Sequence, residues 1–269
     1  MAQIGRTVRV EVGLAGGLAR SWDGLRTAFS VERTSTRAPN SAKVTLYNLS
    51  RDSAAWCRRP GQVLRLSAGY EVPSQLFLGD IDRAERSEAA ADCTVEIEAT
   101  DGGRRFREAR ISRSYSLEVT ASLVLADLAT ALGVPLGSLG ALGDVRMGEG
   151  LTLVGPVRDN LDRMAILLNA HWSIQDGALQ VLGDSDIRAQ VGPLLTPQTG
   201  LVGSPRPVKD SKKKGQIEVV CLLRPEILPG TRFGLQSRDF SGFYRAEDVK
   251  HAGDTHGGEW YTTISARES

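Results

Sequence analysis

The residues best suited to chemistry lie close together near the C-terminal end of the chain. In the run HAGDTHGG, the side chains of His251, Asp254 and His256 fall within six residues. Imidazole and carboxylate groups are good ligands for zinc or iron, so a metal site is one interpretation. The spacing matches no common metal motif, because neither HExxH nor CxxC accompanies it. We favour the other interpretation, a β-hairpin turn with solvated polar tips.

The sequence gives less support to nucleophilic catalysis or phosphate binding. His171 is expected at the C-terminal end of a helix, where an imidazole packs or interacts favourably with the helix dipole. No G-x-S-x-G motif supplies a nucleophile, although a triad assembled in space from distant serines and aspartates stays open. Two glycine-rich runs, GLAGGLARS and GSLGALGDVRMGEG, lack the lysine-serine pair of a phosphate-binding loop and are typical of turns. We therefore predict no enzymatic activity, no cofactor and no catalytic residue.

A lysine-rich run, KDSKKKG, is the strongest local charge feature. It would attract phosphate groups without sequence preference if it lined a channel for nucleic acid. The alternative is a solvated loop between two domains, which we favour because short charged loops are usually solvated. The four lysines are Lys209, Lys212, Lys213 and Lys214.

Two aromatic clusters near the C-terminus are candidates for contacts between subunits, since buried aromatic side chains often anchor interfaces. They are equally suited to the core, and strand alternation requires some members of each cluster to point outward. Both interpretations stay open for Phe240, Phe243, Tyr244, Trp260 and Tyr261.

Composition limits the possible partners and compartments. The 269 residues can bury a sizeable core in two or three domains, and the net charge of +1 gives no general attraction to nucleic acid or anionic membranes. Three widely spaced cysteines predict free thiols in a reducing compartment rather than disulfides. No apolar run is long enough to predict a signal peptide or a membrane-spanning helix, so we expect a soluble protein.

Hydrophobic periodicity predicts a mainly β chain with an α+β insert. Alternation indicates strands through the first hundred residues, interrupted by a short helix that Ser50 caps. In the middle, an amphipathic helix with Leu123 on its apolar face ends at Gly133, a second helix opens at Pro156, and a hairpin turns at Asp176-Gly177. The last third has four predicted strands, over 216–223, 231–237, 242–253 and 259–266.

Five segments between about residues 29 and 102 occur in an order that resembles the opening barrel of phage tail baseplate hub proteins of the late control protein D type. They are FSVE, PNSAKVTLYNLS, GQVLRLSAGY, LFLGDI and ATDG. The stretch from Leu195 to Ile264 is similar to the closing barrel of the same family, with a glycine- and proline-rich lead-in, a lysine-rich loop and four short β-like runs.

This resemblance implies two β-barrel-like tube or hub domains, over 1–102 and 196–269, flanking a small helix-hairpin domain over 103–195. Three copies would then present six barrels around a central channel and adapt a six-fold tail tube to a three-fold spike. The expected partners are further copies in a homotrimer, the tail tube or distal tail protein, the central spike protein, the tape measure protein, and DNA in transient contact. The expected location is the virion baseplate, after assembly in the host cytoplasm and without secretion.

Two other functions stay open. One is a metal-dependent hydrolase that uses His251, Asp254 and His256. The other is a tail-associated adaptor or carbohydrate-binding module built on β-barrels. Metal analysis distinguishes the first from a hub, and the oligomeric state distinguishes the second, because an adaptor need not form a trimer.

Overall fold

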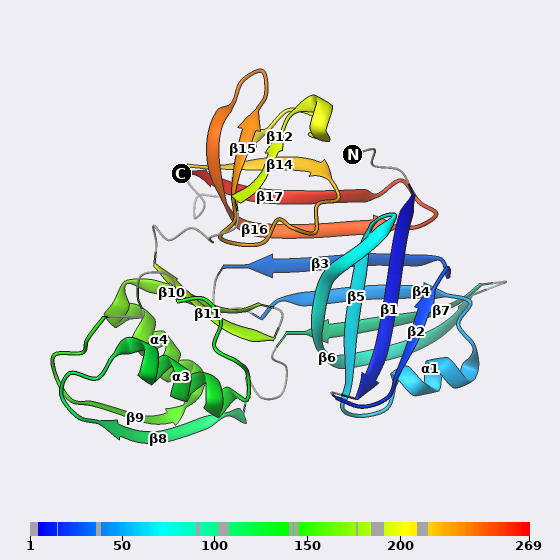
Figure 1. Ribbon diagram of the computed structural model, residues 1–269. Coiled ribbons are helices and arrows are strands. Elements are labelled where there is room, and N and C mark those ends of the chain that lie inside the picture. Colours follow the sequence, from blue (N-terminus) through cyan, green and yellow to red (C-terminus); the bar gives the residue numbers. More distant parts are fainter. Residues whose placement is uncertain are drawn as a thin grey trace.

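Two β-rich lobes lie one above the other in the computed structural model, and a smaller unit with two helices lies beside them (Figure 1). The structure describes residues 5–14, 16–35, 39–89, 92–101, 108–139, 142, 145–175, 177–183, 191–208 and 215–269. We name the three parts the N-lobe (described residues to 101), the insert (108–183) and the C-lobe (191–269). The chain is mainly β, as its periodicity predicts, whereas the two-barrel layout and the domain boundaries at 102 and 195 stay predictions.

The N-lobe forms from strands with strict inward-outward alternation. Val8, Val10 and Val12 of the first strand point into the core, as expected. Ser50 caps the short helix, because its side chain accepts a hydrogen bond from the backbone N–H of Ser53. The elements are β1 (Arg6–Leu14), β2 (Ala19–Asp23), β3 (Thr27–Thr34), β4 (Ser41–Tyr47), α1 (Arg51–Cys57), β5 (Gln62–Tyr70), β6 (Val72–Ala89) and β7 (Asp92–Thr100).

The insert contains the predicted helix pair and hairpin. Gly133 ends the first helix with a positive φ of 70°, as the sequence predicts. One expectation is wrong, because Leu123 is exposed and Val124 takes its place on the buried face. The helix begins at Ala121, and the buried stripe runs through Val124, Leu125 and Leu128. The elements are β8 (Arg110–Tyr115), α3 (Ala121–Leu132), β9 (Leu151–Pro156), α4 (Val157–Leu168), β10 (Ala170–Gln175) and β11 (Ala178–Gly183).

The C-lobe contains the four predicted strands and two that the sequence analysis missed, β12 and the short β13. Its elements are β12 (Val191–Leu195), a 3₁₀ turn η2 (Pro197–Thr199), β13 (Arg206–Pro207), β14 (Gln216–Leu222), β15 (Arg232–Gln236), β16 (Ser241–Asp254) and β17 (Trp260–Glu268). No helix in the described ranges of the chain is long and apolar enough to cross a membrane.

A single antiparallel pairing joins the two lobes into one sheet. The first part of β16 pairs with β15, and after a bulge between Ala246 and Asp248 the strand pairs with β3. A bulge lets one long strand bend and change partners in this way. The strand order through the junction is β14-β17-β16-β3-β4-β7, and Figure 1 shows β16 directly beside β3. The lobes therefore share a backbone hydrogen-bond ladder.

Trp260 ties the C-lobe to the core of the N-lobe. It begins β17, yet its indole is only 1% exposed within the N-lobe cluster of apolar side chains. The ring of Phe29 meets it edge to face with centroids 5.5 Å apart, and Tyr70 does so at 6.4 Å. Such pairs add to the stabilisation that burial of the large indole already provides.

A buried polar network fastens the insert to the N-lobe. The guanidinium of Arg33 on β3 donates to the carbonyl oxygen of Leu76 and, from Nη1, to Gln175 Oε1 at 3.4 Å. Asn40 Nδ2 lies 2.7 Å from the carbonyl oxygen of Ile174 and 3.1 Å from Gln175 Oε1. Because these groups are buried, each needs its hydrogen-bond partner. The tip of the β10-β11 hairpin therefore packs against the N-lobe in one preferred orientation.

Replacing Trp260 by alanine should destabilise both lobes. We expect a loss of about 3–5 kcal/mol in the free energy of unfolding, the usual cost of truncating a buried aromatic side chain. Tyr261→Ala is the matched control, because the next residue along the strand faces outward and is half-buried. Denaturant unfolding monitored by circular dichroism measures both. Equal effects of the two substitutions would contradict this role of Trp260.

Replacing Asn40 by alanine should loosen the insert. The carbonyl of Ile174, Gln175 Oε1 and Asp101 Oδ2 would each lose this donor, at a cost of about 1–3 kcal/mol. Hydrogen exchange of the β10-β11 amides, together with denaturant unfolding, measures the effect. The exposed neighbour Ser41→Ala should leave both unchanged. Unaltered protection of the hairpin in Asn40→Ala would show that the network does not hold the insert.

Candidate functional site

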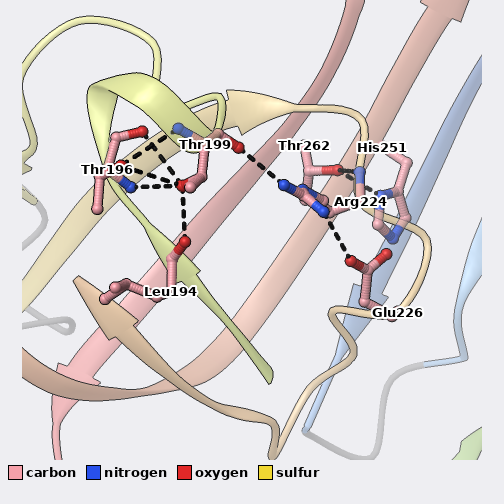
Figure 2. Close-up of polar contacts among 7 residues, drawn as sticks. All are labelled: Leu194, Thr196, Thr199, Arg224, Glu226, His251 and Thr262. Atoms are coloured by element: carbon pink, nitrogen blue, oxygen red, sulfur yellow. Dashed lines mark hydrogen bonds and ion pairs between the residues drawn. The ribbon is translucent and has the colours of Figure 1, made fainter. Parts of the chain in front are cut away.

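His251, the first of the three candidate metal ligands, lies at the junction of the lobes. It is fully buried on β16, opposite Val31 of β3 and Thr262 of β17. Its Nδ1 is 2.9 Å from Thr262 Oγ1, which also accepts a hydrogen bond from the backbone N–H of Arg224 at 2.8 Å (Figure 2). The imidazole thus belongs to the packing of the junction.

Asp254 and the turn that follows it form a latch on the N-lobe. Asp254 Oδ2 is 3.0 Å from Arg26 Nη2, and Asp254 Oδ1 accepts the backbone N–H of His256 at 2.8 Å. Arg6 Nη1 donates to the carbonyl oxygen of Gly257 at 2.6 Å. Partial burial would raise the pKa of Asp254, but the hydrogen bonds from Arg26 and from the His256 and Gly257 backbone outweigh it and hold this pKa below its ordinary value.

The structure does not bring the three candidate ligands together. His251 bonds Thr262 inside the core, Asp254 bonds Arg26, and the exposed His256 bonds its neighbour Thr255. Within the part of the chain that the structure describes, no group of three His, Cys, Asp or Glu side chains is placed to hold a metal ion. Sequence analysis missed Arg6 and Arg26 because they lie 251 and 228 residues from their partners in the turn.

Arg224 fastens two more segments beside the same junction. Its Nη2 donates to the carbonyl oxygen of Thr199 at 2.7 Å, and its Nη1 lies 3.3 Å from Glu226 Oε1 (Figure 2). Thr199 in turn completes a capping box with Thr196 at the end of β12. These bonds connect the entry of the C-lobe to the end of β14.

The aromatic candidates divide between core and surface. Tyr244 and Trp260 are buried, Phe240 packs against the C-lobe core, and Tyr261 is half-buried on the outward face of β17. Phe243 is the member that points outward, with 52% of its surface exposed.

Lys209, Lys212, Lys213 and Lys214 lie outside the described residues. His171 is exposed on β10, immediately after the helix that it was expected to cap.

The cysteines are free thiols, as the sequence predicts. Burial raises the pKa of Cys57 to about 11 and that of Cys221 to about 12. Both therefore stay protonated at neutral pH, and the thiolate form that attacks substrates or binds metals is scarce.

The outward face of the shared sheet carries polar and charged side chains from both lobes. Three ion pairs lie on it: Lys43 with Glu96 at 2.7 Å, Lys250 with Glu32 at 2.8 Å, and Arg206 with Glu218 at 2.6 Å. A groove of about 410 Å³ follows the β3-β16 seam, and its lining includes Glu32, Thr34, Ser41, Asp248, Lys250, Thr263 and Ser265. Short hydroxyl side chains and paired charges suit contact with a polar surface or polymer without strong local attraction.

Comparison with known proteins identifies solved structures with a similar fold. No protein-family model and no curated protein sequence matches the chain. Among solved structures, it is similar to the 43 kDa tail protein of prophage MuSo2 from Shewanella oneidensis (TM-score 0.69, 12% identity, covering 97% of this chain and 96% of that one). It is also similar to the tail protein from Neisseria meningitidis (TM-score 0.72, 11% identity, covering 98% of this chain and 97% of that one).

A third similar structure is the E. coli c3393 protein, described as a type VI secretion system component that resembles tail proteins of bacteriophage T4. Its TM-score is 0.62 at 9% identity, covering 96% of this chain and 76% of that one. At these identities the likeness concerns the fold. The chain shares the fold of these tail proteins over nearly its whole length.

Replacing Arg26 by glutamine should reduce stability at neutral pH only slightly, because the ion pair is partly exposed. Since the folded-state pKa of Asp254 is lowered, its contribution is present above the ordinary carboxyl pKa of about 3.9 and is lost as pH falls through the lowered value. The stability difference between wild type and variant should therefore shrink between pH 5 and pH 2. Denaturant unfolding across this range measures it.

Arg9→Gln is the matched control, because Arg9 pairs with Asp23 at 3.6 Å in a more exposed position. This substitution should have little effect at any pH. A constant difference between wild type and Arg26→Gln from pH 7 to pH 2 would rule out the Asp254 latch.

Proposed function

We propose that this protein is a structural, non-enzymatic baseplate hub of a phage tail or tail-like particle. Three copies form a ring that adapts the six-fold tail tube to the three-fold spike around a central channel. The support is the fold likeness to tail proteins over both lobes and the insert together. The proposal includes two barrel-like domains, over 1–102 and 196–269, with the insert over 103–195 outside the ring.

The single observation that carries this proposal is the continuous sheet across both lobes. Because β3 pairs with β16, one chain presents two β lobes at a fixed angle rather than as two independently moving domains. Three such chains would present six lobes, which matches a six-fold tube from a three-fold assembly. Contacts between neighbouring copies would be heterologous and close into a ring.

The outward face of the shared sheet is a suitable channel wall. A polymer that moves past paired charges and hydroxyl groups meets few isolated charges that would hold it. In this proposal the wall faces DNA or a tape measure protein, and the Lys209–Lys214 run adds phosphate contacts that weaken with salt. The tail tube or distal tail protein and the central spike occupy the two ends of the ring, in the virion baseplate, after assembly in the host cytoplasm and without secretion.

The alternative functions make different demands. A metal-dependent hydrolase needs ligands that converge, and His251, Asp254 and His256 have separate partners in the described structure. An adaptor or carbohydrate-binding module needs no ring, so the oligomeric state decides between it and the hub.

The purified protein should assemble into trimers. Native mass spectrometry is expected to give three times the chain mass of 29.0 kDa, with no bound metal, and electron microscopy of assembled tails should place its density on the tail axis. The His251→Ala and His256→Ala variants each remove one candidate metal ligand, so they separate assembly from metal binding. The His256→Ala variant should still form trimers. A protein that stays monomeric at high concentration, or that carries stoichiometric zinc or iron, would overturn the hub.

A further inference from the structure

An exposed apolar ridge crosses three strands of the C-lobe. Leu194 of β12 lies opposite Gly234 of β15, and Gly234 lies opposite Phe243 of β16, so the three residues form one cross-strand row. Leu194 and Phe243 are 53% and 52% exposed. A Cβ atom at Gly234 would come within 2.8 Å of Leu194 Cδ1, so the leucine side chain lies across the glycine. Exposed leucine and phenylalanine side chains in one cross-strand row are typical of a contact surface.

Arg232 flanks this row as a cation that has no carboxylate partner among the described residues. Its guanidinium carbon lies 4.3 Å from the centroid of the Phe243 ring. Among the described residues it forms no ion pair, and its Nε is buried without a hydrogen-bond acceptor. Its cross-strand neighbour Arg245 is satisfied by Glu247 at 2.8 Å. The β12-β16 ridge, defined as Leu194, Gly234, Phe243 and Arg232, therefore matches a ligand segment with an apolar side chain and a carboxylate next to it.

The β5-β6 turn of this chain presents that combination. Val72 is 76% exposed, and the carboxylate of the adjacent Glu71 forms no ion pair or hydrogen bond with any described residue. Leu117 is also exposed beside a glutamate, but Glu118 is paired with Arg146 at 3.3 Å. Among the exposed large apolar residues whose neighbours in the sequence are all described, Val72 is the one that adjoins a carboxylate without an ion pair.

The backbone of this turn supports a role for its side chains. Glu71 has a φ of 58°, a left-handed conformation that glycine adopts without strain and glutamate rarely adopts. Its N–H bonds the carbonyl oxygen of Gly5 at 2.8 Å, and Tyr70 and Val72 pair directly on either side. The tip is therefore fixed before any contact forms, which lowers the entropy cost of docking.

We propose that the β12-β16 ridge of one copy receives the β5-β6 turn, Glu71 and Val72, of a neighbouring copy of this chain. The Glu71 carboxylate supplies the acceptor that Arg232 lacks, and Val72 packs against Leu194 and Phe243. Because the turn belongs to the N-lobe and the ridge to β12, β15 and the first part of β16 in the C-lobe (Figure 1), the contact joins two different patches and suits a closed ring. The inference rests on the proposed function and specifies one contact of its ring.

A charge-reversal cycle tests the contact in the full-length protein. Arg232→Glu and Glu71→Arg should each raise the concentration at which half the protein is trimeric by about tenfold or more, as loss of a central arginine contact commonly does. The double variant should return to within about threefold of wild type, because the pair is restored with its charges exchanged. Native mass spectrometry over a dilution series measures all four proteins, and circular dichroism melting confirms that each is folded.

Two controls carry the same charge changes outside the contact. Arg238→Glu alters an exposed arginine in the turn before β16, and Glu149→Arg alters an exposed glutamate of the insert. Both should assemble as wild type does.

The outcomes separate this inference from the hub itself. Trimers of unchanged stability in both single variants would overturn the ridge contact and leave the hub standing. Weakening in both singles without recovery in the double variant would show that Glu71 and Arg232 do not pair. Weakening by Arg232→Glu alone would overturn the Glu71 contact, because the ridge would then meet a different segment of the neighbouring copy. A monomeric wild type would overturn both proposals.

Discussion

Seven residue pairs of an antiparallel ladder, from Asp248 opposite Thr34 to Asp254 opposite Ala28, hold the two β lobes together. Because side chains alternate along a strand, the register of this ladder decides which residues of β16 are buried. In the observed register His251 points inward and Lys250 outward. A slip by one residue would bury the lysine and expose the histidine. The pairing therefore sets both the shared core and the polar face.

Buried polar groups at the seams make the arrangement specific. Arg33 and Asn40 of the N-lobe satisfy their hydrogen bonds to Gln175 of the insert only when these two parts of the molecule meet in this way. Such bonds add little net stability, but an incorrect docking would leave them unsatisfied at a cost of about 1–3 kcal/mol each. The proposed ring would require this rigidity, since small errors in the angle between the parts of each copy would prevent closure.

The same residue types that suggest metal chemistry in the sequence serve attachment in the folded chain. Asp254 neutralises Arg26, and the turn around it receives Arg6 through backbone carbonyl groups. The charged residues of the shared sheet are paired in a similar way across neighbouring strands. This distribution of charged residues agrees with the proposed structural role.

Local pattern determined the secondary structure. Alternation in β1, the Ser50 cap, the Gly133 helix end and the four C-lobe strands were predicted from the sequence, because each depends on side chains and backbone preferences within a few residues. The resemblance of ordered segments anticipated the fold of tail proteins. Leu123 was misplaced because the spacing of leucines did not reveal which side of the helix the insert covers.

Tertiary structure alone decided how these elements meet. The pairing of β3 with β16, the burial of Trp260 in the other lobe and the Arg26-Asp254 bond all join residues more than 200 positions apart. Alternation places a residue on one of two faces but does not name the strand opposite it, so neither the core position of Trp260 nor the exposure of Phe243 followed from the sequence. Partners of this kind are selected by the packing of whole sheets, which depends on every strand at once.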